Sequence, residues 1–122
     1  MPAVALISDL VMQSHATAAA ERSGTTIDVV SSTDALLSKL AESPPNLVIL
    51  DLSHPGLDPR QMVPRVRQQL PPGATCLAFG PHVHAERLTA AAEAGCDLVI
   101  SRGQFHAQVD EILRRYSGPR AC

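Results

Sequence analysis

Aromatic residues are almost absent from this sequence: its 122 residues include no Trp, one Tyr and two Phe. Proteins that bind single-stranded nucleic acid stack the bases on aromatic side chains, and this chain has too few of them to form such a platform. An excess of basic residues is also missing, since the formal net charge is −2. We therefore expect no broad basic surface, and we exclude nucleic acid and membranes as main partners.

Signals for export, membrane insertion and disulfide formation are missing as well. The first apolar run, residues 3–7, follows no Lys or Arg and is too short for a signal peptide or a membrane span. The three cysteines form no CxxC pair and leave one over, which is typical of a reducing compartment. We expect a cytoplasmic chain with one domain over residues 1–117 and a polar tail over residues 118–122.

Five short apolar runs alternate with helical patterns along the chain. The runs are residues 3–7, 26–30, 47–50, 76–79 and 98–100. The third run is apolar at consecutive positions, which is typical of a strand that is buried on both faces of a parallel sheet. Five βα units in one domain predict an α/β fold, a five-stranded parallel sheet with helices on both faces, because crossover connections are right-handed.

Two of the helical stretches carry more specific expectations. In the first stretch one face is formed by Val11, His15, Ala18 and Ala19. The helical spacing predicts that this face is buried. In the third stretch Pro64 interrupts the pattern, and Pro is tolerated in the first turn of a helix but not in its interior. We therefore expect the regular part of that helix to begin at Pro64.

Small and polar residues follow the apolar runs, at the edge of the sheet where ligands bind in such folds. They are Ser8 and Asp9 after the first run, Asp51 after the third, Gly80 after the fourth, and Ser101 and Arg102 after the fifth. Two carboxylates at one edge repel each other unless a divalent cation or a basic side chain balances them. Asp9 is a candidate metal ligand and also a candidate N-cap of the first helix. Arg102 is a candidate phosphate-binding residue or a partner of Asp9 or Asp51 in an ion pair.

Two segments carry a resemblance to a known family. Residues 46–56 read NLVILDLSHPG, an apolar strand followed by an aspartate and a Pro-Gly turn, and residues 92–102 read AEAGCDLVISR. Together with the spacing from Asp9 to Asp51, these segments resemble the receiver domain of response regulators over nearly the whole chain. The resemblance implies a flavodoxin-like doubly wound sheet with strand order 2-1-3-4-5. It also implies that Asp51 is the phosphoacceptor and that Asp9, Asp51 and the backbone of Ser53 form a Mg²⁺ site.

Several positions depart from the pattern of that family. Ser8 stands where the family has the first residue of an acidic pair, and Gly80 stands where it has a Ser or Thr that binds the phosphoryl group. Arg102 replaces a lysine of the family, and Val99 replaces its aromatic switch residue. Phosphoryl transfer depends on positioning and on charge neutralisation by Mg²⁺, so these departures imply at most a weak Mg²⁺ site. Gly80 and Arg102 are the positions that would contact a phosphoryl group. Because both depart from the family pattern, the site around Asp51 is interpreted as a degenerate phosphorylation site.

We therefore interpret the chain as a stand-alone receiver-like signalling domain, not an enzyme, that acts mainly through protein–protein contacts. The resemblance places its partner surface on the fourth helix, the fifth strand and the fifth helix. The residues expected on that surface are His84, Arg87, Arg102, Gln104 and Gln108. The partner is expected to be another signalling protein, a histidine kinase included, or a second copy of the chain. The alternative function is a working phosphoacceptor, in which a histidine kinase phosphorylates Asp51.

Functions based on a small ligand have weaker signals. A flavodoxin-like enzyme or binding protein would need a sizeable pocket at the edge of the first and third strands, and no Walker-type loop, GxGxxG motif or Ser/Thr-rich FMN cradle is present. His82 and His84, with Cys76 upstream, form an incomplete zinc set, because zinc needs three or four ligands. His54 follows Asp51 at a spacing that differs by one residue from the cobalamin-binding relatives of this fold.

Overall fold

Five parallel strands form the centre of the structure, a computed structural model that describes residues 3–116. The strands are β1 (Ala3–Leu6), β2 (Ile27–Val30), β3 (Leu47–Asp51), β4 (Thr75–Gly80) and β5 (Leu98–Ser101). Their order in the sheet is β2-β1-β3-β4-β5, and all neighbouring pairs are parallel. The predicted α/β fold and strand order are thus confirmed. The predicted polar tail, residues 118–122, lies outside the described residues.

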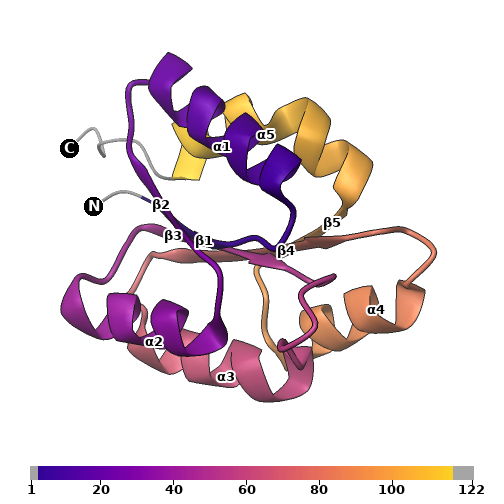
Figure 1. Ribbon diagram of the computed structural model, residues 1–122. Helices are drawn as coiled ribbons and strands as arrows, with labels where there is room; N and C mark the ends of the chain where they lie inside the picture. Colours follow the sequence, from indigo (N-terminus) through magenta and orange to yellow (C-terminus); the bar gives the residue numbers. More distant parts are fainter. Residues whose placement is uncertain (1–2, 117–122) are drawn as a thin grey trace.

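Five helices cover both faces of this sheet (Figure 1). They are α1 (Leu10–Arg22), α2 (Thr33–Glu42), α3 (Pro59–Gln69), α4 (Ala85–Ala94) and α5 (Arg102–Tyr116). Helices α1 and α5 lie on one face, and α2, α3 and α4 lie on the other. Within residues 3–116, none of the helices combines the length and the apolar character needed to cross a lipid bilayer. The doubly wound arrangement leaves the carboxyl ends of the strands open at one edge of the sheet.

Each face of the sheet has its own apolar core, and β3 contributes to both. Leu47 and Ile49 pack on the side of α1 and α5, whereas Val48 and Leu50 pack on the side of the other three helices. Every residue of β3 is buried, as its continuously apolar sequence predicted. The strand therefore has no solvent-facing side, and its last residue, Asp51, is positioned by packing on both faces of the sheet.

The buried face of α1 differs from the predicted one. Its buried residues are Met12, Ala16, Ala19 and Ala20, whereas Val11 is 74% exposed. Of the predicted face, Ala19 is buried, whereas Val11 lies in the first turn of the helix, where no other element covers it. Small side chains form most of the packed face, which lets α1 lie close to the sheet and to α5.

The start of α3 also differs from the prediction. The helix begins at Pro59 rather than at Pro64, and the Asp58 side chain caps it by accepting a hydrogen bond from the Arg60 N–H at 3.1 Å. Pro59 occupies the first turn, where a missing N–H costs little. Pro64 lies in the interior of the helix, so the carbonyl of Arg60 loses its helical hydrogen bond. The cap and the buried face of α3 outweigh that loss.

Candidate functional site

The carboxyl ends of four strands bring the predicted polar residues to one edge of the sheet, which we call the rim. The rim consists of Ser8, Asp9, Asp51, Gly80, Ser101 and Arg102. The register of the strands aligns these positions. Leu6 pairs with Leu50, Asp51 with Phe79, and Gly80 with Ser101. The sequence therefore predicted correctly which residues meet at this edge.

Asp51, the last residue of β3, is fully buried. Both oxygens of its carboxylate accept hydrogen bonds from the chain itself. Oδ1 accepts the backbone N–H of Ser53 at 2.9 Å, and Oδ2 accepts the backbone N–H and the hydroxyl of Ser8 at 3.2 and 3.1 Å. These three donors compensate a carboxylate whose burial would otherwise be costly. Ser8, one of the departures from the family pattern, is thus a direct partner of Asp51.

The two carboxylate oxygens of Asp9 also have separate partners. Oδ1 accepts the backbone N–H of Val11 at 2.9 Å, which makes Asp9 the N-cap of α1. Oδ2 accepts a hydrogen bond from the guanidinium of Arg102 in an ion pair. The Val11 N–H, and after it the Arg102 guanidinium, hold the pKa of Asp9 below its ordinary value. Of the roles left open by the sequence, the structure has the N-cap for Asp9 and the ion pair for Arg102.

The lowered pKa of Asp9 predicts a loss of stability in acid. Because the pKa is lower in the folded chain than in the unfolded chain, the charged form of Asp9 stabilises the fold above the ordinary value of 3.8, and this stabilisation is lost as the pH falls below it. Asp9→Asn keeps a good N-cap and removes the charge. We expect wild type to have the higher Tm at neutral pH and the two Tm values to converge as the pH falls below 3.8 and through the lowered pKa of Asp9, measured by circular dichroism. A Tm difference that stays constant with pH would contradict this assignment.

Arg102 reaches Asp9 because α5 begins directly after β5, with no loop between them. The hydroxyl oxygen of Ser101 accepts the Gln104 N–H at 3.1 Å, and the side-chain oxygen of Gln104 accepts the Ser101 N–H at 2.9 Å. This reciprocal pair is a capping box of the pattern S-x-x-Q, and it makes Arg102 the first residue of the helix. The S-x-x-Q pattern is visible in the sequence at residues 101–104. From the resemblance, Gln104 was predicted to lie on the partner surface, and this capping pattern was not used.

Gly80 ends β4 at the rim without a side chain. A Cβ at this position would lie 3.1 Å from the Cβ of Leu52 and 3.7 Å from Cδ2 of Leu88. Leu52 is itself 1% exposed, so it has little freedom to move away. A Ser or Thr at this position would therefore require the packed Leu52 to shift by a few tenths of an ångström. Leu52 and Leu88 pack closely against Gly80, where the family has a hydroxyl-bearing side chain.

The residues predicted for the partner surface differ in how free they are. Those with exposed side chains are His84, Gln104 and Gln108. Arg102 is half-buried and paired with Asp9. Arg87 is also half-buried, because its Nε donates to the carbonyl of Leu52 and its Nη2 to the carbonyl of Leu57, both at 2.6 Å. The guanidinium of Arg87 therefore holds the loop between β3 and α3 against α4.

His54 fixes the same loop from the other side. Its Nδ1 accepts the backbone N–H of Gly56 at 3.0 Å, and its Nε2 lies 2.7 Å from the carbonyl oxygen of Ser31. Because Nδ1 is the acceptor, Nε2 carries the proton and donates to Ser31. The ring links the β3–α3 loop to the β2–α2 loop, and both of its nitrogens are engaged within the chain. Sequence reasoning considered His54 only as a ligand and missed this structural role.

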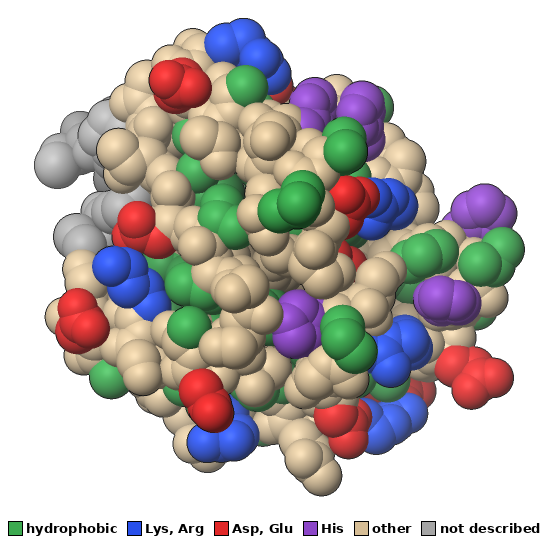
Figure 2. All heavy atoms as spheres, viewed as in Figure 1, with side chains coloured by type: hydrophobic (Ala, Val, Ile, Leu, Met, Phe, Trp, Pro, Cys, Tyr) green, Lys and Arg blue, Asp and Glu red, His purple; other side chains and the backbone are tan. Residues whose placement is uncertain are grey.

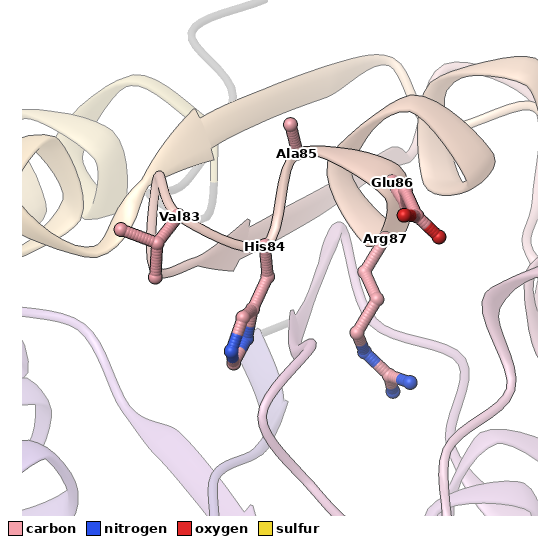
Figure 3. A pocket seen from close by; sticks show the side chains of 5 residues that line it. All are labelled: Val83, His84, Ala85, Glu86 and Arg87. Carbon is pink, nitrogen blue, oxygen red and sulfur yellow. The ribbon is translucent and has the colours of Figure 1, made fainter.

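A pocket of about 350 Å³ opens where β4 leads into α4. It is lined by five consecutive residues, Val83, His84, Ala85, Glu86 and Arg87. Figure 3 shows the side chains of His84 and Arg87 pointing to the same side of the segment, while Ala85 points away from them. Its lining residues include none from the rim, so this pocket is not the one that a flavodoxin-like enzyme would place between the first and third strands.

The zinc alternative is not supported. Within residues 3–116 there is no group of three or more His, Cys, Asp or Glu side chains placed to hold a metal ion. Cys76, the third member of the incomplete set with His82 and His84, is buried in β4, and its sulfur contacts Cys96 instead.

On the face seen in Figure 2, basic and acidic side chains are interspersed rather than gathered in one patch. This agrees with the small net charge of the chain.

Comparison with known proteins finds relatives by structure rather than by sequence. No protein-family model matches the sequence, and no curated protein matches it significantly. The receiver domain of NtrX from Brucella abortus matches with a TM-score of 0.78 and 16% identity, over 93% of this chain and 95% of that domain. The receiver domain of the sensor histidine kinase PA1611 from Pseudomonas aeruginosa PAO1, with a magnesium ion in its active-site cleft, matches with a TM-score of 0.78 and 15% identity, over 94% and 95% of the two chains.

A third match is a CheY-like response regulator receiver domain protein from Methanospirillum hungatei JF-1. Its TM-score is 0.73 and its identity 15%, over 90% of this chain and 94% of that one. The chain therefore has the fold of response-regulator receiver domains, as the two sequence segments implied.

Proposed function

We propose that this chain is a signalling domain with the receiver fold that acts through protein–protein contacts while its rim stays in a single state. One observation carries the proposal: the carboxylates of Asp9 and Asp51 are both engaged by donors of the chain itself. The two negative charges lie at one edge of the sheet, and the guanidinium of Arg102 supplies a balancing positive charge. The rim thus has an internal substitute for a cation.

A tightly bound Mg²⁺ does not fit this donor set. Mg²⁺ needs oxygen ligands in near-octahedral geometry and is usually held by carboxylates that are free to face it. Arg102 occupies one oxygen of Asp9, and the N–H of Val11 occupies the other. Ser8 contributes a hydroxyl that donates to Asp51 where a carboxylate ligand would be needed. For Mg²⁺ to bind here, the ion pair and the Ser8 hydrogen bonds would have to break.

Phosphorylation of Asp51 meets the same obstacles. A carboxylate oxygen can attack a phosphoryl donor only if the donor reaches it in line, and Asp51 is fully buried. The oxygen Oδ2 would first have to give up its two hydrogen bonds to Ser8. The phosphoryl group would then find no hydroxyl at Gly80 and a packed Leu52 in its place. We infer that Asp51 serves as a structural link between β1 and β3.

The parts of a receiver switch are likewise replaced by fixed contacts. Gly80 has no group that could follow a phosphoryl oxygen, and Val99 has no ring that could change rotamer. Arg87 ties α4 to the β3–α3 loop through two main-chain carbonyls. A modification that makes no different contacts in two states shifts no equilibrium between them. The surface of α4, β5 and α5, with His84 and Gln108 exposed on it, would then present a constant shape to another signalling protein or to a second copy of the chain.

Incubation with acetyl phosphate and Mg²⁺ tests this proposal against the alternative of a working phosphoacceptor. We expect the intact mass of the wild-type chain to remain unchanged, because Asp51 is neither accessible nor free of hydrogen bonds. The Asp51→Asn variant serves as the matched negative control, and a receiver domain that accepts phosphate from the same reagent serves as the positive control. A phosphoryl adduct that maps to Asp51 in wild type and is absent in Asp51→Asn would overturn the proposal.

A further inference from the structure

Two cysteines lie together at the end of the sheet opposite the rim. Cys76 is near the start of β4, and Cys96 directly follows Gly95, the C-cap of α4. Their sulfur atoms are 3.6 Å apart and share a hydrogen bond, and both thiols are free. Cys76 is buried, whereas Cys96 is half-buried. The pair therefore has a partly exposed outer cysteine and a buried inner one.

We propose that Cys76 and Cys96 form a redox modification site, at which a hydroperoxide converts the two thiols to a disulfide. The Cys96 sulfur attacks the peroxide; an S–O bond forms, the O–O bond breaks, and the leaving oxygen takes a proton, so an alcohol or water departs and a sulfenic acid remains. The Cys76 sulfur then attacks the Cys96 sulfur; the S–S bond forms, the S–O bond breaks, and the oxygen leaves as water with the proton of Cys76. The two thiols lose two electrons in total, and the peroxide gains them.

The environment of the two sulfurs suits these separate roles. The hydrogen bond between the two sulfurs lowers the pKa of Cys96, although burial works in the opposite direction. The same hydrogen bond, together with burial, raises the pKa of Cys76. Thiolates are the nucleophiles in reactions with peroxides, so the outer cysteine is favoured for the first step. The inner cysteine keeps its proton until it attacks the sulfenic acid.

The geometry requires only a local movement. A disulfide has an S–S length of about 2.05 Å, so the sulfurs must approach by about 1.5 Å. Cys76 is held in place, because its N–H donates to the carboxylate of Asp97 and its carbonyl accepts the Asp97 N–H, both at 2.8 Å. Cys96 follows α4, and its N–H donates to the carbonyl of Ala91 at 3.1 Å, so rotation about its Cα–Cβ bond would have to supply the movement. The bond would link β4 to the end of α4, whose first turn Arg87 already ties to the β3–α3 loop.

Peroxide treatment of the whole chain tests the proposal. The substitution Cys122→Ser removes the third thiol, which lies outside the described residues, and leaves the pair unaltered. After treatment with hydrogen peroxide and alkylation in denaturant, we expect neither Cys76 nor Cys96 to be alkylated and peptide mapping to find them joined. We also expect the oxidised chain to have a higher Tm, because the cross-link restricts the unfolded chain, and dithiothreitol to reverse the shift.

Two variants separate the roles of the thiols. In Cys122→Ser/Cys76→Ala we expect dimedone to trap a sulfenic acid on Cys96, with no disulfide formed within the chain. In Cys122→Ser/Cys96→Ala we expect Cys76 to stay reduced at the same dose. Two results in the Cys122→Ser chain would overturn the proposal, and neither depends on how the alanine variants fold. One is Cys96 oxidised to a sulfinic acid while Cys76 is still free, and the other is both thiols left reduced at a dose that oxidises a free thiol peptide.

Discussion

Replacing Phe79 by Ala is expected to reduce the free energy of unfolding by about 3–5 kcal/mol, the range observed when large aromatic side chains are removed from protein cores. Phe79 of β4 is fully buried and stacks on Phe105 of α5, with ring centroids 4.2 Å apart and planes 5° from parallel. The chain has two Phe and no Trp, so this pair supplies most of the aromatic volume of the core. Three of the four buried residues of α1, which packs in the same core, are alanines, whose side chains are too short to fill the cavity.

Denaturant unfolding measures this effect, and a fall in Tm of roughly 10–20 °C should accompany it. Val83→Ala is the matched control, because Val83 is 73% exposed and its truncation should change the stability by less than about 0.5 kcal/mol. A loss of less than about 1 kcal/mol in Phe79→Ala would mean that the helices on this face do not pack on the sheet as described.

Replacing Asp51 by Ala is the second substitution with a large expected effect, about 2–4 kcal/mol of destabilisation. The substitution removes the buried carboxylate that accepts from the N–H groups of Ser8 and Ser53, and a hydrogen bond to a charged group contributes about 1.5–3 kcal/mol. The sign of the effect is informative. In an edge where two carboxylates repel each other, removal of one carboxylate would relieve the repulsion and stabilise the fold. In the rim described above, the carboxylate of Asp51 holds β1 and β3 together.

Two further variants make this measurement specific. Asp51→Asn keeps the shape and one acceptor but points an amide N–H₂ at a backbone donor, so its loss of stability should be smaller than that of Asp51→Ala. Glu21→Ala removes the same charge from an exposed position of α1 and should change the stability by less than about 0.5 kcal/mol. A stability of Asp51→Ala equal to or above that of wild type would show that the three hydrogen bonds of Asp51 do not hold the rim.

Much of the fold follows from local patterns in the sequence. The continuously apolar segment 47–50 predicted a strand buried on both faces, and the alternation of five such runs with helices predicted the parallel sheet. The errors arose where a local rule competed with packing. Pro64 indicated a helix start, but the cap at Asp58 and the buried face of α3 extend the helix through it. Val11 indicated a buried face of α1, but an alanine face packs instead.

The sequence was sufficient to predict which residues lie at the rim, but not which hydrogen bonds they make. Parallel strands end at a common edge, so the sequence sufficed to group Asp9, Asp51 and Arg102. It could not show that the Ser8 hydroxyl and amide bind Asp51, because that depends on the register between β1 and β3. The position of the Arg102 side chain, by contrast, follows from a short sequence pattern next to it. The capping pair at residues 101–104 starts α5 without a loop and brings the guanidinium to Asp9.

Titration of the ¹⁵N-labelled chain with Mg²⁺ and then with beryllofluoride, followed by NMR, tests most directly whether the rim is closed by its own side chains. We expect the amide signals of Ser8, Ser53 and Gly80 to stay in place through both additions, because Arg102 and Ser8 already engage the carboxylates that the ion and the phosphoryl mimic require. Saturable shifts at these amides on addition of Mg²⁺, followed by shifts along α4 and β5 on addition of beryllofluoride, would contradict the account and identify a working switch.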